Sequence, residues 1–363
     1  MKLIFDNAFQ DDLKQYTEAV LAKAGVSSRT AEREVIYLAE QGNTVCLKLY
    51  GDMLFYKKVM NRHAMREAFG LYLRAAGLSV SEDGTWQESG RAYPEACWVI
   101  AYYLVHYRRE SDLKDCEMIP EIDRMSLSER MVTAAELAAA CLGAVEAPGA
   151  INLLGRILQE AAKDEAVRTA LLPVWEKRLP DELLAKLGAG AAEEETIPEK
   201  TDFSDSDACE KAAIRFFEAA ADAGYVYACN NLAAREAERI IEIAAEGKQE
   251  ELAAVLERYL RWLRIAADRY EPYAANRLGL FYRTGEVRGT KETVHFREYI
   301  DSSLAREYFY KATVYPDANS AWAYLNLMKY YHQDYDRDID LLNEHMAIMK
   351  ELNPKVYDIA MEM

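Results

Sequence analysis

A short phrase of small and apolar residues recurs along this chain and constrains its fold more than any other feature. Each copy closes one helical pattern, passes through a turn and opens the next helical pattern with small residues at fixed offsets. A supersecondary unit that repeats every few tens of residues buries its apolar face against its neighbours, so this pattern predicts a repeat array. The four copies lie at residues 39–51, 146–155, 220–233 and 266–282.

The offsets inside the phrase have a simple packing explanation. Two antiparallel helices approach closely only where the side chains at their crossing are small, and larger apolar side chains fill the groove beside the crossing. A single amphipathic bundle in which the alanines recur by chance is the alternative, but it does not account for the same offsets in four places. In three copies an alanine is followed four residues later by a leucine: Ala150 and Leu154, Ala228 and Leu232, and Ala274 and Leu278.

These phrases resemble Sel1-like repeats, relatives of the tetratricopeptide repeats that are built from helix pairs of roughly forty residues. Gly285-Glu286-Val287 follows Tyr282 where the family has a glycine-containing loop, and residues 212–220 and 305–312 resemble the second helix of a pair. The resemblance implies an all-α fold, a right-handed α-α superhelix (solenoid) of about six irregular helix pairs. Two of the units are looser copies, and insertions near 80–90, 109–125, 164–207 and 288–301 make the array irregular.

The chain divides at one polar, acidic stretch. Residues 188–207 are almost free of aliphatic side chains, which predicts an exposed loop or linker between an N-terminal repeat segment, 1–187, and a C-terminal one, 208–363. No strand of convincing length or alternation is apparent. In the C-terminal segment the periodicity predicts helices at 208–222, 226–246, 249–268, 272–283, 302–313, 318–332 and 336–351.

Composition limits the classes of partner and the cellular compartment that we expect. The formal net charge of −17 and the pI of about 4.9 disfavour nucleic acid and anionic membrane surfaces as partners, although such a charge most simply serves solubility. The N-terminus does not read as a secretory signal, and the longest apolar stretch, 96–105, is far shorter than the ~20 residues of a membrane helix. The six cysteines form no CxxC pair, which is typical of buried thiols in a reducing compartment. We therefore expect a cytoplasmic protein.

The residue types that carry catalysis are not arranged for it. The five histidines show no HExxH or other ligand spacing, and the chain has neither a GxSxG elbow nor a phosphate-binding glycine loop after a strand. The prediction is therefore a protein without catalytic residues, metal or cofactor, and not an enzyme.

Aromatic and amide side chains near the starts of the first helices are the candidate binding residues. In tetratricopeptide-like arrays the first helix of each pair lines the concave face, and by that analogy these positions would meet a partner. Asparagine can hydrogen-bond a peptide backbone, and aromatic anchors concentrate binding energy; alternatively, the asparagines bridge neighbouring repeats. The candidates are Asn152, Tyr227, Asn230, Tyr273, Asn276, Trp98 and Trp322.

The function that these observations favour is a non-catalytic adaptor or scaffold that binds a protein or peptide along its concave face. Two alternatives stay open. One is a hydrolase-type enzyme that acts on a small molecule in the groove, and the other is a self-associating protein whose end helices pair in a homodimer. The sequence does not identify the partner.

Overall fold

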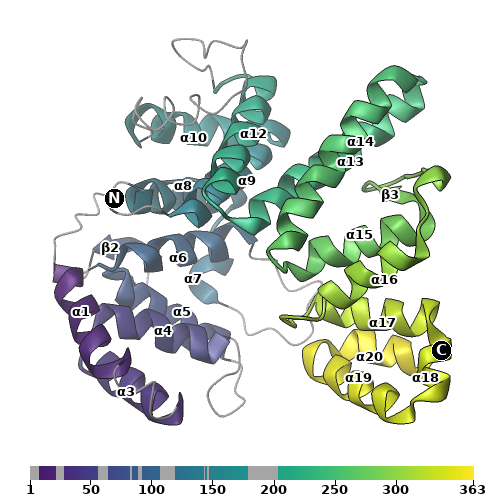
Figure 1. The fold of residues 1–363 in the computed structure, drawn as a ribbon. Helices are drawn as coiled ribbons and strands as arrows, with labels where there is room; N and C mark the ends of the chain where they lie inside the picture. Colours follow the sequence, from purple (N-terminus) through teal and green to yellow (C-terminus); the bar gives the residue numbers. More distant parts are fainter. Residues whose placement is uncertain are drawn as a thin grey trace. The chain divides into compact units, whose positions relative to one another are not determined.

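The computed structural model describes residues 8–21, 28–55, 64–81, 84–88, 92–106, 119–142, 144, 147–178 and 203–363. The protein is mostly helical and divides into two compact units, Met1–Ala220 and Ala221–Met363, here called unit 1 and unit 2 (Figure 1). Of the acidic segment predicted at 188–207, residues 188–202 lie outside the described residues. Phe203 is buried, and the first helix after the segment begins at Ser206.

Unit 1 is built from helices that pack mainly on their neighbours in the chain. Helix α3 packs on α4, α4 on α5, α5 on α6 and α6 on α8. Helix α8 then packs against both α9 and α10. The helices are α1 (Ala8–Tyr16), the π-helical η1 (Thr17–Leu21), α3 (Ser28–Glu40), α4 (Thr44–Phe55), α5 (Met65–Ala75), α6 (Pro94–His106), α7 (Pro120–Asp123), α8 (Leu127–Leu142), α9 (Pro148–Lys163), α10 (Glu165–Arg178) and α12 (Ser206–Asp222), which ends just past the boundary between the units.

Unit 2 continues the same design. Helix α13 packs on α14, α14 on α15, α15 on α16 and α16 on α17, and α17 contacts α19 and α20. Its helices are α13 (Val226–Glu246), α14 (Gln249–Asp268), α15 (Pro272–Thr284), the short η3 (Arg297–Tyr299), α16 (Ser302–Lys311), α17 (Ser320–Tyr330), α18 (His332–Arg337), α19 (Ile339–Leu352) and α20 (Pro354–Met361). The bounds predicted for α13 and α14 are confirmed, whereas α18 and α20 were not predicted.

The prediction of a chain without strands is wrong in two places. Leu78–Val80 (β1) pairs antiparallel with Trp86–Glu88 (β2), and Glu286–Arg288 (β3) pairs with Thr293–His295 (β4). Each hairpin lies in a predicted loop or insertion and buries one apolar anchor, Leu78 in the first and Val287 in the second. Three-residue strands are too short to show a period-two pattern in sequence.

The recurring phrase forms a turn in which one residue adopts the left-handed conformation. Gly42 has φ +89° and Gly224 has φ +93°, and the amide of each bonds back to the carbonyl three residues earlier. Glycine at this point ends a helix without steric cost. In the copy that precedes α15 the same position is Tyr270, with φ +60°, and its amide bonds to the carbonyl of Ala267. A tyrosine in this conformation costs about 1–2 kcal/mol.

The glycine of each Leu-Gly pair in the phrase leaves room for an aromatic ring from a later helix. A Cβ atom at Gly155 in α9 would lie 2.7 Å from the Phe217 ring of α12, and one at Gly279 in α15 would lie 2.5 Å from the Phe309 ring of α16. Both phenylalanines are fully buried. The two contacts show why a glycine follows the leucine, because any side chain there would displace a core ring.

A buried histidine joins the last helices of unit 2. Nδ1 of His345 in α19 lies 2.9 Å from the hydroxyl of Tyr335 in α18, and the Tyr324 ring of α17 packs edge-on against the imidazole. Burial lowers the pKa of His345, although nearby Glu344 opposes the shift, and burial raises the pKa of Tyr335 above its ordinary range. The tyrosine hydroxyl therefore donates to a neutral imidazole.

We expect unit 2 to lose stability as the pH falls below about 6.5, the ordinary histidine value. His345 takes up a proton more readily in the unfolded chain than in the fold, so acid favours unfolding. Replacing Tyr335 by Phe is expected to cost about 1 kcal/mol at neutral pH, the usual worth of one hydrogen bond. Urea unfolding at neutral and mildly acidic pH measures both effects, with exposed His332→Gln as the control. An equal pH slope in H345Q and wild type would contradict the assignment.

Candidate functional site

The first helices of unit 2 each begin with an exposed aromatic side chain. Tyr227 is the second residue of α13, Tyr273 the second of α15 and Trp322 the third of α17, and they are 50%, 39% and 42% exposed. Their neighbours Ala228, Ala274 and Ala321 are fully buried. The small residues hold each helix start close to the next layer, so the adjacent aromatic position points away from the core.

Hydrogen bonds between amide and carboxylate groups connect these helices beneath the aromatic side chains. Asn276 in α15 accepts a hydrogen bond from Nδ2 of Asn326 in α17 at 2.9 Å, and both side chains are buried. Asn230 in α13 donates to the carboxylate of Glu271, which caps α15. Asn230 and Asn276 therefore each bridge to the next first helix, one of the two roles that the sequence left open.

Asn230 also keeps an acceptor without a donor. Its Oδ1 is buried, and no described residue donates a hydrogen bond to it. A buried carbonyl oxygen of this kind is uncommon in folded proteins and costs stability unless a water or a ligand N–H meets it. The role predicted for Asn230 and Asn276 in binding a partner is thus compatible with their bridging role, and it stays a prediction.

Glu271 is the most deeply buried carboxylate of this region, with 4% of the residue exposed. It precedes Pro272, the first residue of α15, and accepts hydrogen bonds from the amides of Tyr273 at 3.2 Å and Ala274 at 2.6 Å. Burial raises the pKa of this carboxyl, while the bonds from Ala274, Asn230 and Tyr273 act in the opposite direction. Glu271 is thus both the cap of α15 and its link to α13.

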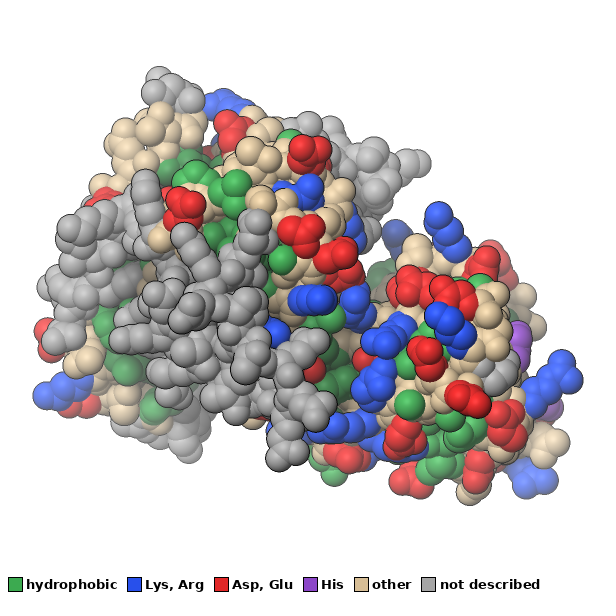
Figure 2. All heavy atoms as spheres, turned by 90° about the horizontal axis from the view of Figure 1, so that it is seen from above, with side chains coloured by type: hydrophobic (Ala, Val, Ile, Leu, Met, Phe, Trp, Pro, Cys, Tyr) green, Lys and Arg blue, Asp and Glu red, His purple; other side chains and the backbone are tan. Residues whose placement is uncertain are grey.

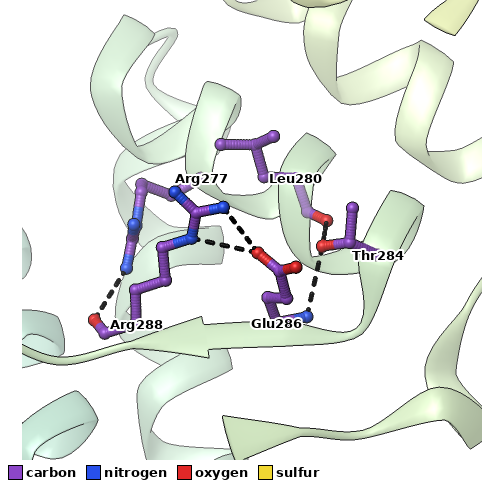
Figure 3. Close-up of polar contacts among 5 residues, drawn as sticks. All are labelled: Arg277, Leu280, Thr284, Glu286 and Arg288. Carbon is purple, nitrogen blue, oxygen red and sulfur yellow. Dashed lines mark hydrogen bonds and ion pairs between the residues drawn. The ribbon is translucent and has the colours of Figure 1, made fainter. Parts of the chain in front are cut away.

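Two arginines lie where α15 meets the hairpin β3–β4 (Figure 3). Arg277, which lies beside Tyr273, donates from Nη2 to the carbonyl of Arg288 at 3.1 Å. Arg288 is held by Glu286, with donor–acceptor distances of 3.0 and 2.7 Å. Figure 3 shows both guanidinium groups over the same side of β3. This cluster fixes the hairpin against α15 and places a cationic group next to the exposed Tyr273.

The other two predicted binding residues belong to unit 1. Trp98 in α6 is half-buried, and its ring would lie 3.4 Å from a Cβ atom at Gly149, so it packs over the start of α9. Asn152 in α9 is 8% exposed. Neither has the exposed position that Tyr227, Tyr273 and Trp322 share.

Unit 1 contains an open groove, a feature that the hydrolase alternative requires. Its volume is about 290 Å³, and its lining is mainly apolar, with the side chains of Tyr16, Val20 and Met53 and two carboxylates. Of these two, Asp52 accepts hydrogen bonds from the Tyr72 hydroxyl at 2.9 Å and from Lys48 at 2.8 Å. The other is Glu32.

The described thiols are buried, and no metal-type cluster forms among the described side chains. Cys46, Cys97, Cys141, Cys209 and Cys229 are buried and free, and burial raises the pKa of Cys46 to about 12; Cys116 lies outside the described residues. Within the part of the chain that the structure describes, no His, Cys, Asp and Glu side chains gather in a group that could hold a metal. Acidic and basic side chains are interspersed on the face shown in Figure 2.

Sequence reasoning missed three residues of this region. Glu271 carried a usable signal, because an acidic residue directly before a proline marks a helix start. Arg277 and the left-handed Tyr270 carried none, since one depends on the unpredicted hairpin and the other occupies a position where glycine is usual.

Comparison with solved structures gives a distant likeness. No family model matches the chain, and no curated protein matches it. The chain is similar to a protective antigen present in uropathogenic Escherichia coli strains that displays an SLR fold. The identity is 14%, the match covers 97% of this chain and 79% of the antigen, and the TM-score is 0.24. A likeness at this TM-score carries no argument about function. None of the described helices is both long and apolar enough to cross a bilayer.

Proposed function

We propose that unit 2 is a non-catalytic module that binds a protein or peptide partner through the exposed aromatic side chains of its first helices. The observation that carries the proposal is that three successive first helices each have an exposed aromatic side chain within their first three residues, namely Tyr227, Tyr273 and Trp322. Single exposed aromatics are ordinary on a protein surface. Three near the starts of successive first helices form a set, and tyrosine and tryptophan are among the residues that most often anchor interfaces.

We further infer that the array is of the Sel1-like kind and winds as a right-handed superhelix. The supporting features are the left-handed turn residue of the phrase, the Leu-Gly pairs that accept buried phenylalanines, and the asparagine bridges between first helices. A cytoplasmic location and a lack of nucleic-acid or membrane partners belong to the same proposal.

The proposal is tested by capture from a native lysate with quantitative mass spectrometry. Removing all three side chains, Y227A with Y273A and W322A, is expected to reduce the captured partner at least about tenfold, since one interface anchor alone is often worth 2 kcal/mol or more. The matched control is Y37A with Y102A, two comparably exposed tyrosines of unit 1. Equal capture by the triple variant and the control would refute the proposal.

Self-association is separated from partner binding by sedimentation. A homodimer built on these aromatics would dissociate on dilution, and the triple variant would sediment as a monomer at every concentration. A wild-type chain that stays monomeric while it captures a partner supports the adaptor function.

A further inference from the structure

Unit 2 carries a row in which cations and aromatic rings alternate, here called the Arg–Tyr ladder. Nζ of Lys329 lies 5.1 Å from the Tyr330 ring centre, and Cζ of Arg283 lies 5.1 Å from the same ring and 5.9 Å from that of Tyr331. Cζ of Arg306 lies 5.6 Å from Tyr331 and 5.7 Å from Tyr310. The contacts are continuous, so the row forms one surface made from α15, α16, α17 and the start of α18.

Hydrogen bonds hold the middle of the ladder in place. Both the Tyr331 hydroxyl and the Arg283 guanidinium donate to Ser302, the first to its carbonyl at 2.6 Å and the second to its hydroxyl at 2.7 Å. Rings and bonds together limit the rotamers of Arg283 before anything binds. A cation fixed in this way loses less conformational freedom on binding than a free surface arginine.

The ladder has more positive charge than its own carboxylates neutralise. Arg306 pairs with Asp334 at 2.6 Å. For Arg283 and Lys329 the described residues provide no carboxylate within ion-pair distance, although the whole chain has a net charge of −17. Both cations lie in the last turns of their helices, where the helix dipole favours them by about 0.3–1 kcal/mol. The dipole accounts for cations at these ends, but not for three tyrosine rings arranged around them.

We propose that the Arg–Tyr ladder binds a short, carboxylate-rich segment of a partner protein. A planar guanidinium backed by a ring presents its outer N–H groups to a carboxylate in the bidentate geometry that such pairs prefer. Charges on a short segment stay within about one Debye length, ~8 Å, of the cations. A nucleic acid or an anionic membrane extends further and meets the acidic remainder of the molecule, which repels it.

This inference does not depend on the function proposed for the exposed aromatics. Tyr273 and Trp322 lie at the N-terminal ends of α15 and α17, whereas Arg283 and Lys329 lie in the last turns of the same helices. The variant that removes Tyr227, Tyr273 and Trp322 is therefore expected to bind an acidic peptide as wild type does, so the two proposals can fail separately.

The test is fluorescence anisotropy of the full chain with a labelled peptide of alternating Asp and Gly. The variant R283Q with K329Q is expected to raise the dissociation constant at least about tenfold, and to weaken the dependence of binding on salt. The control is K291Q with R297Q, which removes the same charge from two exposed cations outside the ladder. R283K keeps the charge but loses the planar fork, and an intermediate affinity is expected. Thermal unfolding of each variant verifies that unit 2 remains folded.

Several results would overturn the proposal. Equal loss in the ladder variant and the control would mean that net charge alone attracts the peptide. Equal binding of an Asn-Gly peptide would mean that carboxylates are not recognised. Tighter binding of a single-stranded oligonucleotide, or of vesicles containing phosphatidylserine, would assign the surface to another class of partner, and no binding of the Asp-Gly peptide would leave the ladder a structural feature.

Discussion

Replacing Gly285 by alanine is expected to lower the free energy of unfolding of unit 2 by about 3 kcal/mol, and the matched change at Gly247 by only about 1 kcal/mol. Both glycines end a helix, and both have φ +71°. Alanine is strained in the left-handed conformation at either position. The two sites differ in their surroundings, so the comparison separates backbone strain from packing.

The extra cost at Gly285 comes from the backbone of the segment after β4. A Cβ atom at Gly285 would lie 2.6 Å from the carbonyl oxygen of Phe296 and 2.9 Å from its carbonyl carbon, whereas one at Gly247 would meet nothing within 4 Å. The amide of Phe296 also donates to the Gly285 carbonyl at 2.7 Å, so this backbone cannot move away without losing that bond. Overpacking in a position of this kind costs about 1–3 kcal/mol beyond the strain.

Urea unfolding together with amide hydrogen exchange in α15 measures both changes. In G285A we expect early loss of protection in β3 and β4, because Gly285 ties the hairpin to the end of α15. Equal destabilisation by G285A and G247A would show that the close approach to Phe296 does not exist in solution.

The parts of this fold that sequence predicted are those set by local rules. Helices α13 and α14 were located at both ends, because Gly224 and Gly247 interrupt strong helical periodicity. The roles of Gly42 and of the Leu-Gly pairs could be predicted from the repeat. In each of these places a glycine either allows the turn or allows two helices to cross closely.

The parts that sequence could not predict depend on contacts between distant residues. Asn276 and Asn326 are fifty positions apart, and their bond depends on the register between α15 and α17. The Arg–Tyr ladder likewise combines residues of α15, α16 and α17 with Tyr331 before α18, and only the fold brings them together. The hairpin β3–β4 has strands too short for a periodic signal, so Arg277 could not be assigned to it.

Of the predicted binding residues, Tyr227, Tyr273 and Trp322 are all exposed near the start of a helix, but Trp98 and Asn152 are not exposed. The difference arises because the analogy used offsets from the repeat alone. Offsets place a residue on a helix, whereas its exposure also depends on what covers that helix. In unit 1 the Trp98 ring covers Gly149 at the start of α9, a contact that no offset predicts.

Replacing Glu271 by alanine is expected to destabilise unit 2 by about 3 kcal/mol. Loss of a helix cap costs about 1 kcal/mol, and leaving the half-buried Asn230 side chain without its acceptor adds about 1–3 kcal/mol. The matched control is Asp301→Ala at the cap of α16. Asp301 also accepts two amide bonds, from Ser303 and Leu304, but it is exposed, and its bond to α15 runs from its backbone amide to the Tyr282 carbonyl, which alanine keeps. For that variant we expect a loss of about 1 kcal/mol.

The pH dependence of E271Q distinguishes a buried carboxylate from an ordinary cap. Because burial raises the pKa of Glu271, the folded chain holds this proton to higher pH than the unfolded chain does. Its contribution to stability is therefore largest below 4.5, the ordinary value, and declines as the pH rises through the raised pKa. Glutamine does not titrate and keeps one acceptor. The stability of E271Q relative to wild type is therefore expected to rise between about pH 4 and pH 7. Equal losses in E271A and D301A, with no such gain in E271Q, would mean that Glu271 does not link α13 to α15 through Asn230.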